Sequence, residues 1–273
     1  MTATESSIDL KRFQAFIFDL DGCIYVGNTV IPRVPDVIEK LRRLGKKVLF
    51  VTNNATKSPR EFALKLRHLG LEASANDVLT SGTATAMYLS KKFGKCKVYP
   101  VGGESLKGEL RKWGHQIFKV NQADKADFVV ACLDFEFSYK KLSAASNAVR
   151  NGKKFIATNI DPVIPVEGGF MPGAGAIVSA IVTATGKEPF VIGKPARHVL
   201  DMALEKLEAT PEETVIVGDR LDTDIEGGNE LNLYTILVLS GATTADHARS
   251  IDDPKLTPKL ILPDAGRMLD HLS

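Results

Sequence analysis

The sequence predicts an α/β protein with a Rossmann-like parallel sheet and a second αβ series in the middle of the chain. Strand-like and helix-like stretches alternate along nearly the whole sequence, which is typical of parallel sheets covered by helices. The strand-like stretches are apolar runs without polar alternation, as in strands buried on both faces. At 273 residues the chain is large for one compact domain and suits two.

The first part of the chain predicts two buried strands and three helices. Pro59 stands at a first helical position after Ser58, and Glu61 completes a capping box, so a helix begins there. Gly45 and Gly70 follow the apolar periodicity of two helices and are expected to end them. The strands are expected at 15–18 and 47–52, and the helices at 35–44, 58–69 and about 83–93.

The middle of the chain begins its own series of strands and helices and ends in an unusual segment at 159–175. That segment holds three of the 13 prolines and four glycines. Long loops within compact domains usually serve function, so this one is a candidate for substrate contact, with plain turn chemistry as the alternative. Strands are expected at 97–101, 128–131 and 155–158, and helices at 104–113 and 138–150.

The last part of the chain returns to alternating strands and helices. Gly186 is expected to end one helix, and Asp264 is expected to cap the last one. The strands are expected at 190–192, 214–217, 235–239 and 260–262, and the preceding helices at 176–185, 196–207 and 225–231.

The composition is that of an ordinary globular protein, with 44% hydrophobic and 25% charged residues. A formal net charge of +2 gives no indication of nucleic-acid or membrane binding. Cys23, Cys96 and Cys132 are odd in number and widely spaced, which fits neither a disulfide framework nor a zinc site. The polar start at 1–11 lacks the apolar core of a signal peptide, so we expect a cytoplasmic protein.

Four polar clusters each follow an apolar strand directly. The carboxyl ends of parallel strands lie along one edge of a sheet, so we expect these clusters to meet in one cleft. Carboxylate oxygens there suit Mg²⁺, and lysine, threonine and asparagine donors suit phosphoryl oxygens. The clusters are Asp19 with Asp21, Thr52-Asn53-Asn54, Lys194, and Asp219 with Asp224.

Each cluster also has a purely structural interpretation. The first can be two solvated acids, the second the start of a turn, the third a solvated loop lysine, and the fourth an acidic helix start favoured by the helix dipole. However, carboxylates as close as Asp19 and Asp21 repel each other unless a cation lies between them. The ordered conjunction of four clusters at strand ends favours a metal site, with Asp19 free to act as a nucleophile.

This ordered set resembles the four motifs of the haloacid dehalogenase (HAD) superfamily of phosphohydrolases. The resemblance extends to the branch that includes the NagD-type, 4-nitrophenyl-phosphate, phosphoglycolate and pyridoxal-phosphate phosphatases. It implies a HAD core at 1–82 and 188–273, with an αβ cap domain inserted at 83–187. The motifs stand here as Asp19-Leu20-Asp21-Gly22, Val51-Thr52-Asn53, Gly193-Lys194-Pro195 and Gly218-Asp219-Arg220-Leu221-Asp222-Thr223-Asp224.

The resemblance implies a role for each motif residue. Asp19 would attack phosphorus to give an aspartyl-phosphate, and Asp21 would act as general acid and then general base. Mg²⁺ would be held by the Asp19 side chain, the Asp21 backbone carbonyl, Asp219 and, directly or through water, Asp224. Phosphoryl oxygens would be bound by Thr52, Asn53 and Asn54 with the neighbouring backbone, and Lys194 would offset charge between Asp19 and the phosphate. Asp222 is expected to stay outside this group.

The implied function is a Mg²⁺-dependent phosphomonoester hydrolase acting on a small phosphorylated metabolite. Phosphoglycolate, nucleotide, sugar and 4-nitrophenyl phosphates all stay open as substrates. The pyridoxal-phosphate branch has a histidine about where Ile164 stands, which weakens that choice. Relatives of this type also suggest a possible homodimer through the cap, with no nucleic acid or membrane as partner.

Three alternatives to hydrolysis stay open. A phosphotransferase or mutase on the same core would pass the phosphoryl group to another hydroxyl instead of water. A phosphorylatable receiver module combines similar residues but has roughly half this length and no inserted domain. A non-catalytic phosphate-binding protein would be expected to lack Asp19 or Asp21, and both are present.

Overall fold

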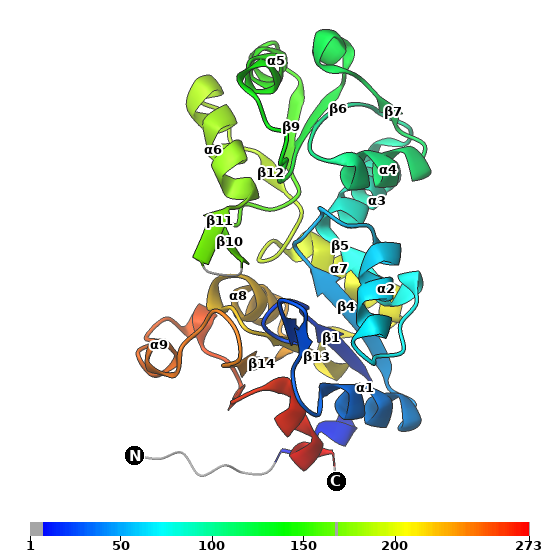
Figure 1. Ribbon diagram of the computed structural model, residues 1–273, viewed down its shortest axis with the longest axis vertical. Helices are drawn as coiled ribbons and strands as arrows, with labels where there is room; N and C mark the ends of the chain where they lie inside the picture. Colours follow the sequence, from blue (N-terminus) through cyan, green and yellow to red (C-terminus); the bar gives the residue numbers. More distant parts are fainter. Residues whose placement is uncertain (1–7, 167–168, 273) are drawn as a thin grey trace. The chain divides into compact units, whose positions relative to one another are not determined.

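Strand β1 (Ala15–Phe18) lies inside a six-stranded sheet in the computed structural model, which describes residues 8–166 and 169–272 (Figure 1). The strand order is β15-β14-β13-β1-β4-β5. The pairs β1–β13, β1–β4, β13–β14 and β14–β15 are all parallel, as the apolar runs predict. The other strands are β4 (Lys47–Thr52), β5 (Val78–Thr80), β13 (Thr214–Gly218), β14 (Tyr234–Val238) and β15 (Leu260–Leu262).

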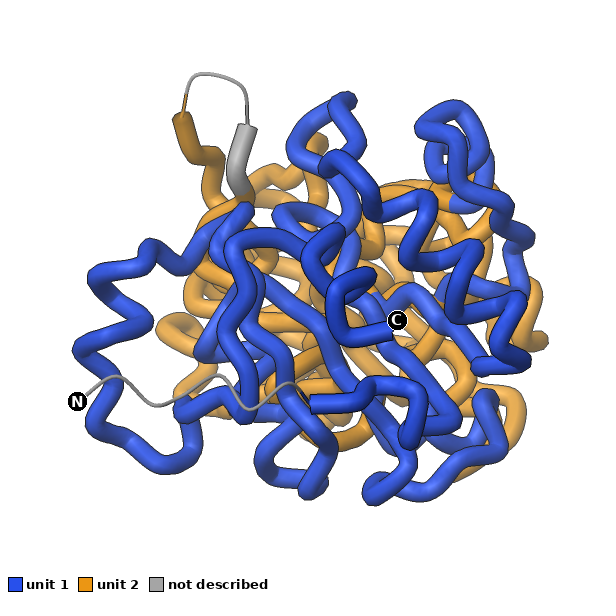
Figure 2. The backbone as a smooth tube through the Cα atoms, turned by 90° about the horizontal axis from the view of Figure 1, so that it is seen from below, with its two compact units in different colours: residues 1–51, 63–78, 200–273 blue, residues 52–62, 79–199 orange. Residues whose placement is uncertain are grey.

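The chain divides into two compact units, which Figure 2 colours separately. The first unit comprises residues 1–51, 63–78 and 200–273, and the second comprises 52–62 and 79–199. The predicted cap boundaries at 83 and 187 are not these boundaries and stay a prediction.

Helix α1 (Val34–Arg43) illustrates why the apolar spacing predicts the helices of the first unit. Its buried residues, Val34, Val37, Ile38 and Leu41, recur at three and four positions and so share one face. The capping box of α2 (Pro59–His68) is confirmed, because Ser58 Oγ accepts from the Glu61 backbone N–H and Glu61 Oε2 accepts from the Ser58 backbone N–H. The other α-helices that lie wholly or partly in this unit are α7 (Arg197–Leu207), α8 (Glu226–Glu230) and α9 (Ala245–Arg249). The predicted last helix is a 3₁₀ helix, Ala265–His271, and its predicted cap is wrong, because the Asp264 side chain makes no capping hydrogen bond there.

A short hairpin directly after β1 is absent from the sequence prediction. Strands β2 (Tyr25–Val26) and β3 (Thr29–Val30) pair antiparallel across the residues Gly27-Asn28. Gly27 has a φ of 58°, the left-handed conformation that such two-residue turns require and that glycine adopts at no steric cost. Strands of two residues are too short to give a recognisable hydrophobic alternation.

The second unit contains its own five-stranded parallel sheet, as predicted for the middle of the chain. The strand order is β12-β9-β8-β6-β7, and all four neighbouring pairs are parallel. Strand β12 follows the second αβ series in the sequence and pairs with β9 of this sheet. The strands are β6 (Lys97–Val101), β7 (Gln116–Ile117), β8 (Phe128–Ala131), β9 (Lys154–Ala157) and β12 (Phe190–Val191).

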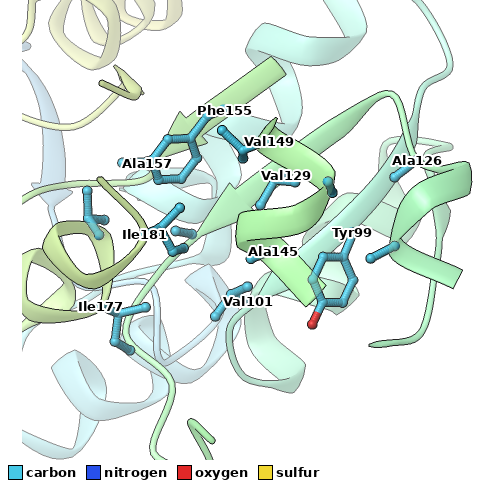
Figure 3. Packing of buried hydrophobic residues seen from close by; sticks show 14 residues of the cluster. Tyr99, Val101, Ala126, Val129, Ala145, Val149, Phe155, Ala157, Ile177 and Ile181 are labelled. Atoms are coloured by element: carbon cyan, nitrogen blue, oxygen red, sulfur yellow. The ribbon is translucent and has the colours of Figure 1, made fainter. Parts of the chain in front are cut away.

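The hydrophobic core of this unit joins the sheet to helices α5 (Tyr139–Arg150) and α6 (Ala174–Thr185). In Figure 3, Val101 and Val129 of the sheet lie among Ala145 of α5 and Ile177 and Ile181 of α6. Alanines lie among branched and aromatic residues in this cluster, which allows close packing of helix on sheet. The remaining helices of the unit are α3 (Ser81–Phe93) and α4 (Glu104–Lys112).

The segment at 159–175, expected to be a loop, contains a β-hairpin instead. Strands β10 (Val163–Val166) and β11 (Gly169–Pro172) pair antiparallel. The prolines of this segment favoured the prediction of a loop. Pro165 and Pro172 lie instead in an isolated two-stranded sheet, whose edges tolerate proline. Residues 167 and 168 of this segment, like the polar chain start at 1–7, lie outside the described residues.

Within the described ranges, no helix combines the length and the apolar character required to cross a bilayer.

Candidate active site

Three carboxylates meet in the first unit where strands β1 and β13 end. Asp19 follows β1, Asp219 follows β13, and Asp224 lies in the π-helical turn Leu221–Ile225 after it. One oxygen of each carboxylate lies within 4.8 Å of the others. Asp219 and Asp224 are buried and Asp19 is half-buried. Parallel pairing of Phe18 with Val217 explains this meeting, because it brings the two strand ends level.

Backbone groups and glycines hold Asp219 in place. Its Oδ2 accepts from the backbone N–H of Ala242 at 2.6 Å, and its carbonyl accepts from the backbone N–H of Thr243 at 3.1 Å. A Cβ added to Gly22 or Gly241 would overlap the Asp219 carboxylate. Gly22 also has a φ of 80°, so the turn after Asp21 requires glycine for both conformation and space.

Asp224 is oriented by the turn that contains it. Its Oδ2 accepts from the Arg220 backbone N–H and from Thr223 Oγ1, both at 3.3 Å. A Cβ on Gly218 would overlap this side chain, so glycine at the end of β13 makes room for it. Asp222 points elsewhere, as expected: its exposed carboxylate pairs with the Arg220 guanidinium, with Oδ1 3.0 Å from Nε.

The side chain of Asp21 is not among these three carboxylates and has a different partner. The Tyr25 hydroxyl, on the hairpin β2–β3, donates to Asp21 Oδ2 at 3.3 Å. Burial, together with the negative charges of Asp21 and Asp19, raises the pKa of Tyr25, so the phenol keeps its proton and acts as a donor. The Lys65 ammonium lies 3.4 Å from the centroid of the same ring. Sequence reasoning missed Tyr25, although it stands only four residues after Asp21.

The second unit holds the other predicted residues, beginning with Lys194 and Asn53. Both are buried, with 2% and 8% of their surface exposed. Asn53 Oδ1 accepts from the Lys194 backbone N–H, and Asn53 Nδ2 donates to the Lys194 carbonyl, each at 2.9 Å. Asn53 Nδ2 also lies 3.2 and 3.3 Å from the two carboxylate oxygens of Asp161, a residue that the sequence analysis did not single out.

Thr52 and Asn54 form a tight polar turn at the end of β4. Thr52 Oγ1 accepts from the Asn54 backbone N–H at 3.1 Å. Asn54 Oδ1 accepts from the backbone N–H of Thr56 at 2.9 Å and from its hydroxyl at 2.7 Å. These local bonds orient the turn that follows the strand, so the turn interpretation and the phosphate-binding interpretation are compatible here.

Other chemistry-bearing residues do not gather into a second site of this kind. Over 8–166 and 169–272, the Asp19–Asp219–Asp224 group is the one set of three histidine, cysteine or acidic residues close enough to share a metal ion. The thiols of Cys23, Cys96 and Cys132 are buried. Burial raises the pKa of Cys132 to about 11, which keeps that thiol protonated at neutral pH.

Known proteins match the chain over nearly its whole length. Residues 16–116 match the haloacid dehalogenase-like hydrolase family, and residues 191–267 match a HAD-hydrolase-like family. The acid sugar phosphatase of Staphylococcus saprophyticus is 38% identical over 96% of this chain and 99% of that protein. A 4-nitrophenylphosphatase from Thermotoga maritima has a TM-score of 0.91 at 33% identity, covering 97% of this chain and 99% of that one.

NagD from E. coli K-12 is also similar, with a TM-score of 0.85 at 33% identity over 93% of this chain and 97% of that one. The strand-end carboxylates, the two parallel sheets and these matches agree with the resemblance seen in the motifs. The chain belongs to the haloacid dehalogenase-like hydrolases and, among them, to the NagD-like branch of phosphatases.

Proposed function

We propose that the protein hydrolyses the phosphomonoester of a small metabolite, with Mg²⁺ as cofactor and an aspartyl-phosphate on Asp19 as intermediate. The observation that carries the proposal is the group of three carboxylate oxygens of Asp19, Asp219 and Asp224 within 4.8 Å of one another. Three like charges in a partly buried place favour a bound cation strongly.

The donor set fits Mg²⁺, which prefers oxygen ligands and binds through few carboxylates. We expect the ion to be held by the side chains of Asp19 and Asp219 and the backbone carbonyl of Asp21, with Asp224 helping directly or through water. When bound, the ion neutralises charge on the phosphoryl oxygens.

Two chemical steps follow from the carboxylates. A carboxylate oxygen of Asp19 attacks phosphorus, forming the aspartyl-phosphate as the bond from phosphorus to the ester oxygen breaks, and the leaving oxygen takes a proton from Asp21. Asp21 then accepts a proton from water as that water attacks the aspartyl-phosphate, which releases inorganic phosphate and regenerates Asp19. Because Asp21 moves a proton in both steps, the hydrogen bond from Tyr25 that orients its carboxylate supports this role.

The second unit would supply the groups that bind the phosphoryl oxygens. Thr52, Asn54 and the backbone around them offer hydroxyl and N–H donors, and Lys194 offers a buried positive charge. The motifs Val51-Thr52-Asn53 and Gly193-Lys194-Pro195, the first of which ends strand β4, support this role for the second unit.

We propose a sugar phosphate as the leading substrate class, with 4-nitrophenyl phosphate as a convenient reporter. The names of two relatives, an acid sugar phosphatase and a 4-nitrophenylphosphatase, support this choice over phosphoglycolate and nucleotides. The cap hairpin β10–β11 exposes Val163, Phe170 and Met171 and is our candidate for contact with the leaving group.

Phosphate release from a panel of sugar, nucleotide, two-carbon and aryl phosphates tests the proposal. We expect release that requires Mg²⁺, loss of at least 1,000-fold in Asp19→Asn, as is typical when a nucleophile is removed, and near wild-type activity in Asp222→Asn. Asp222 is the matched control because it lies in the same acidic loop but pairs with Arg220. Absence of release from every ester, or transfer of the phosphoryl group to an added alcohol in preference to water, would contradict hydrolysis.

A further inference from the structure

The side chain of Asn53 joins three segments of the second unit. Its Oδ1 accepts from the Lys194 backbone N–H, and its Nδ2 donates to the Lys194 carbonyl and to the Asp161 carboxylate. An amide nitrogen carries two protons, so one can serve each acceptor. Rotating the amide by 180° would place Nδ2 against the Lys194 N–H, and Oδ1 against the Lys194 carbonyl and the Asp161 carboxylate. The contact therefore requires asparagine in this one orientation.

The backbone around this contact is held as firmly as the side chain. The Asn53 carbonyl accepts from Ser81 Oγ at 2.5 Å and from Asn159 Nδ2 at 2.8 Å. The Gly193 backbone N–H donates to the Thr158 carbonyl at 2.8 Å. A Cβ on Gly193 would lie 2.5 Å from that carbonyl oxygen and 2.6 Å from Asn53 Oδ1, so glycine permits the close approach.

A lysine side chain has four rotatable bonds, and the place of its ammonium depends on where its backbone is fixed. Asn53 bonds both the N–H and the C=O of Lys194, which fixes the position and the direction of that residue. Small displacements of charged groups in active sites cost much activity, since about 1 Å of misplacement lowers rates roughly 100-fold.

We propose that Asn53 is a positioning residue for Lys194, and that Asp161 connects the segment leading into hairpin β10–β11 to the same amide. This inference rests on the proposed phosphatase function, in which Lys194 offsets the charge of the phosphoryl group. Asn53 then acts through Lys194, and this role replaces the phosphate contact that the motif predicted for its side chain. The segment proposed to meet the leaving group is thereby coupled to the lysine.

A double-mutant cycle on kcat/KM for 4-nitrophenyl phosphate tests this inference. We expect Asn53→Ala to lower kcat/KM about 10- to 100-fold and Lys194→Met to lower it further. The double variant should be no worse than Lys194→Met alone, because the Asn53 amide has nothing left to position. Multiplicative effects in the double variant would overturn the proposal, since they would mean that Asn53 acts independently of the lysine.

The role proposed for Asp161 is tested by a second double-mutant cycle on kcat/KM. Asp161→Ala should lower kcat/KM less than Asn53→Ala, because both bonds to Lys194 remain, and it should have no effect in the Asn53→Ala background. Asp161→Asn keeps an oxygen that can accept from Asn53, so this variant should retain most of the wild-type kcat/KM. If Asp161→Ala lowers kcat/KM as much in the Asn53→Ala background as in the wild type, Asp161 does not act through the Asn53 amide.

Hydrogen exchange gives a readout that needs no activity. The Lys194 backbone N–H should be protected in the wild type and should exchange at least 10-fold faster in Asn53→Ala, while the core amides of β8 keep their protection. Unchanged protection of Lys194 would overturn the contact itself. Asn147→Ala, at an exposed asparagine on α5, is the matched control for loss of an asparagine and should change neither the exchange nor kcat/KM.

The two readouts separate the two proposals. If the wild type releases no phosphate, the proposed function is contradicted, and so is the proposed effect of Asn53 on catalysis through Lys194. A wild type that is active, together with multiplicative losses or unchanged Lys194 exchange, contradicts the positioning role alone. Thermal unfolding of each variant, with assays well below its midpoint, ensures that kcat/KM refers to folded protein.

Discussion

The hydroxyl of Tyr25 lies 3.3 Å from Oδ2 of Asp21 and connects the hairpin after β1 to the second aspartate of the first motif. The phenol is fully buried, and Gly22 turns the chain so that its N–H donates to the Tyr25 carbonyl at 2.8 Å. The side chain that we propose as general acid and base is thus oriented by a residue of its own loop.

Replacing Tyr25 by phenylalanine removes that donor and leaves the ring in place. We expect kcat/KM, which covers the steps up to departure of the leaving group, to fall about 10-fold for alkyl phosphates, the size of one lost hydrogen bond to a charged group. The loss should be smaller for 4-nitrophenyl phosphate, because 4-nitrophenolate is a good leaving group that needs little help from an acid. The measurement is kcat/KM for a series of esters that differ in leaving-group pKa.

Tyr139→Phe is the matched control, because Tyr139 is 85% exposed. It should leave every ester unchanged. Equal losses across the whole series of esters in Tyr25→Phe would argue that the hydroxyl supports the fold generally and has no part in orienting Asp21.

Gly22→Ala should both displace the Asp219 carboxylate and destabilise the folded protein. The new Cβ would overlap the Asp219 carboxylate, and the backbone would stay at a φ of 80°. Gly45→Ala separates the two effects, since Gly45 has a φ of 71° with no atom within 4 Å of an added Cβ. We expect Gly45→Ala to cost about 1 kcal/mol of unfolding free energy and Gly22→Ala distinctly more, with loss of Mg²⁺ binding by calorimetry. Equal costs would mean that the Asp219 side chain moves aside freely.

The fold was largely predictable because its strands are short apolar runs and its helices carry clear stop signals. Three of the four predicted strands before a polar cluster lie in the six-stranded sheet: β1 precedes Asp19, β4 ends at Thr52, and β13 ends just before Asp219. The strand before Lys194 is β12, which pairs with β9 of the other sheet, so the expectation that all four clusters follow strands of one sheet was wrong for Lys194. The hairpins β2–β3 and β10–β11 and the strands β5 and β7 were missed. These strands are too short, or too rich in proline, for hydrophobic periodicity to distinguish them from loops.

The site was predictable only as far as its chemistry lies in strand-end motifs. Asp19, Asp219 and Asp224 come together as expected. The partners of Asp21 and Lys194 could not be read from the sequence, because a hydrogen bond such as that between Asn53 and Asp161 spans 108 positions and depends on side-chain direction. Tyr25 had a usable signal, a tyrosine four residues from an aspartate, but its role depends on the unrecognised hairpin.

The buried thiol of Cys132 predicts how stability changes in alkaline solution. Burial raises its pKa from 9.0 to about 11, so the folded protein disfavours the thiolate relative to the unfolded chain. The stability from this group is complete below pH 9 and is lost as the pH rises to 11, at up to about 1.4 kcal/mol per pH unit. Urea unfolding from pH 8 to 11 should show a shallower decline in Cys132→Ala.

A second group contributes to the same alkaline range. Burial and the nearby charge of Asp134 raise the pKa of Tyr99 to about 12, so Tyr99→Phe should flatten the decline above pH 10. If the slopes for wild type and Cys132→Ala coincide between pH 9 and 11, the thiol is not the group that titrates.

Removing one carboxylate from the Asp19–Asp219–Asp224 group should stabilise the metal-free protein and abolish the effect of Mg²⁺ on its stability. Without metal, Asp219→Asn should unfold at a higher temperature than wild type, because it relieves repulsion while its amide oxygen can still accept from Ala242. Mg²⁺ should stabilise the wild type in a concentration-dependent way, by about 2.7 kcal/mol at 100 times its Kd, and should leave the stability of Asp219→Asn unchanged.

Asp222→Asn, whose native carboxylate pairs with Arg220, should respond to Mg²⁺ like the wild type. Thermal unfolding over a Mg²⁺ titration, starting from chelator-treated protein, measures all three. A metal response retained by Asp219→Asn, or lost by Asp222→Asn, would place the ion elsewhere in the acidic loop.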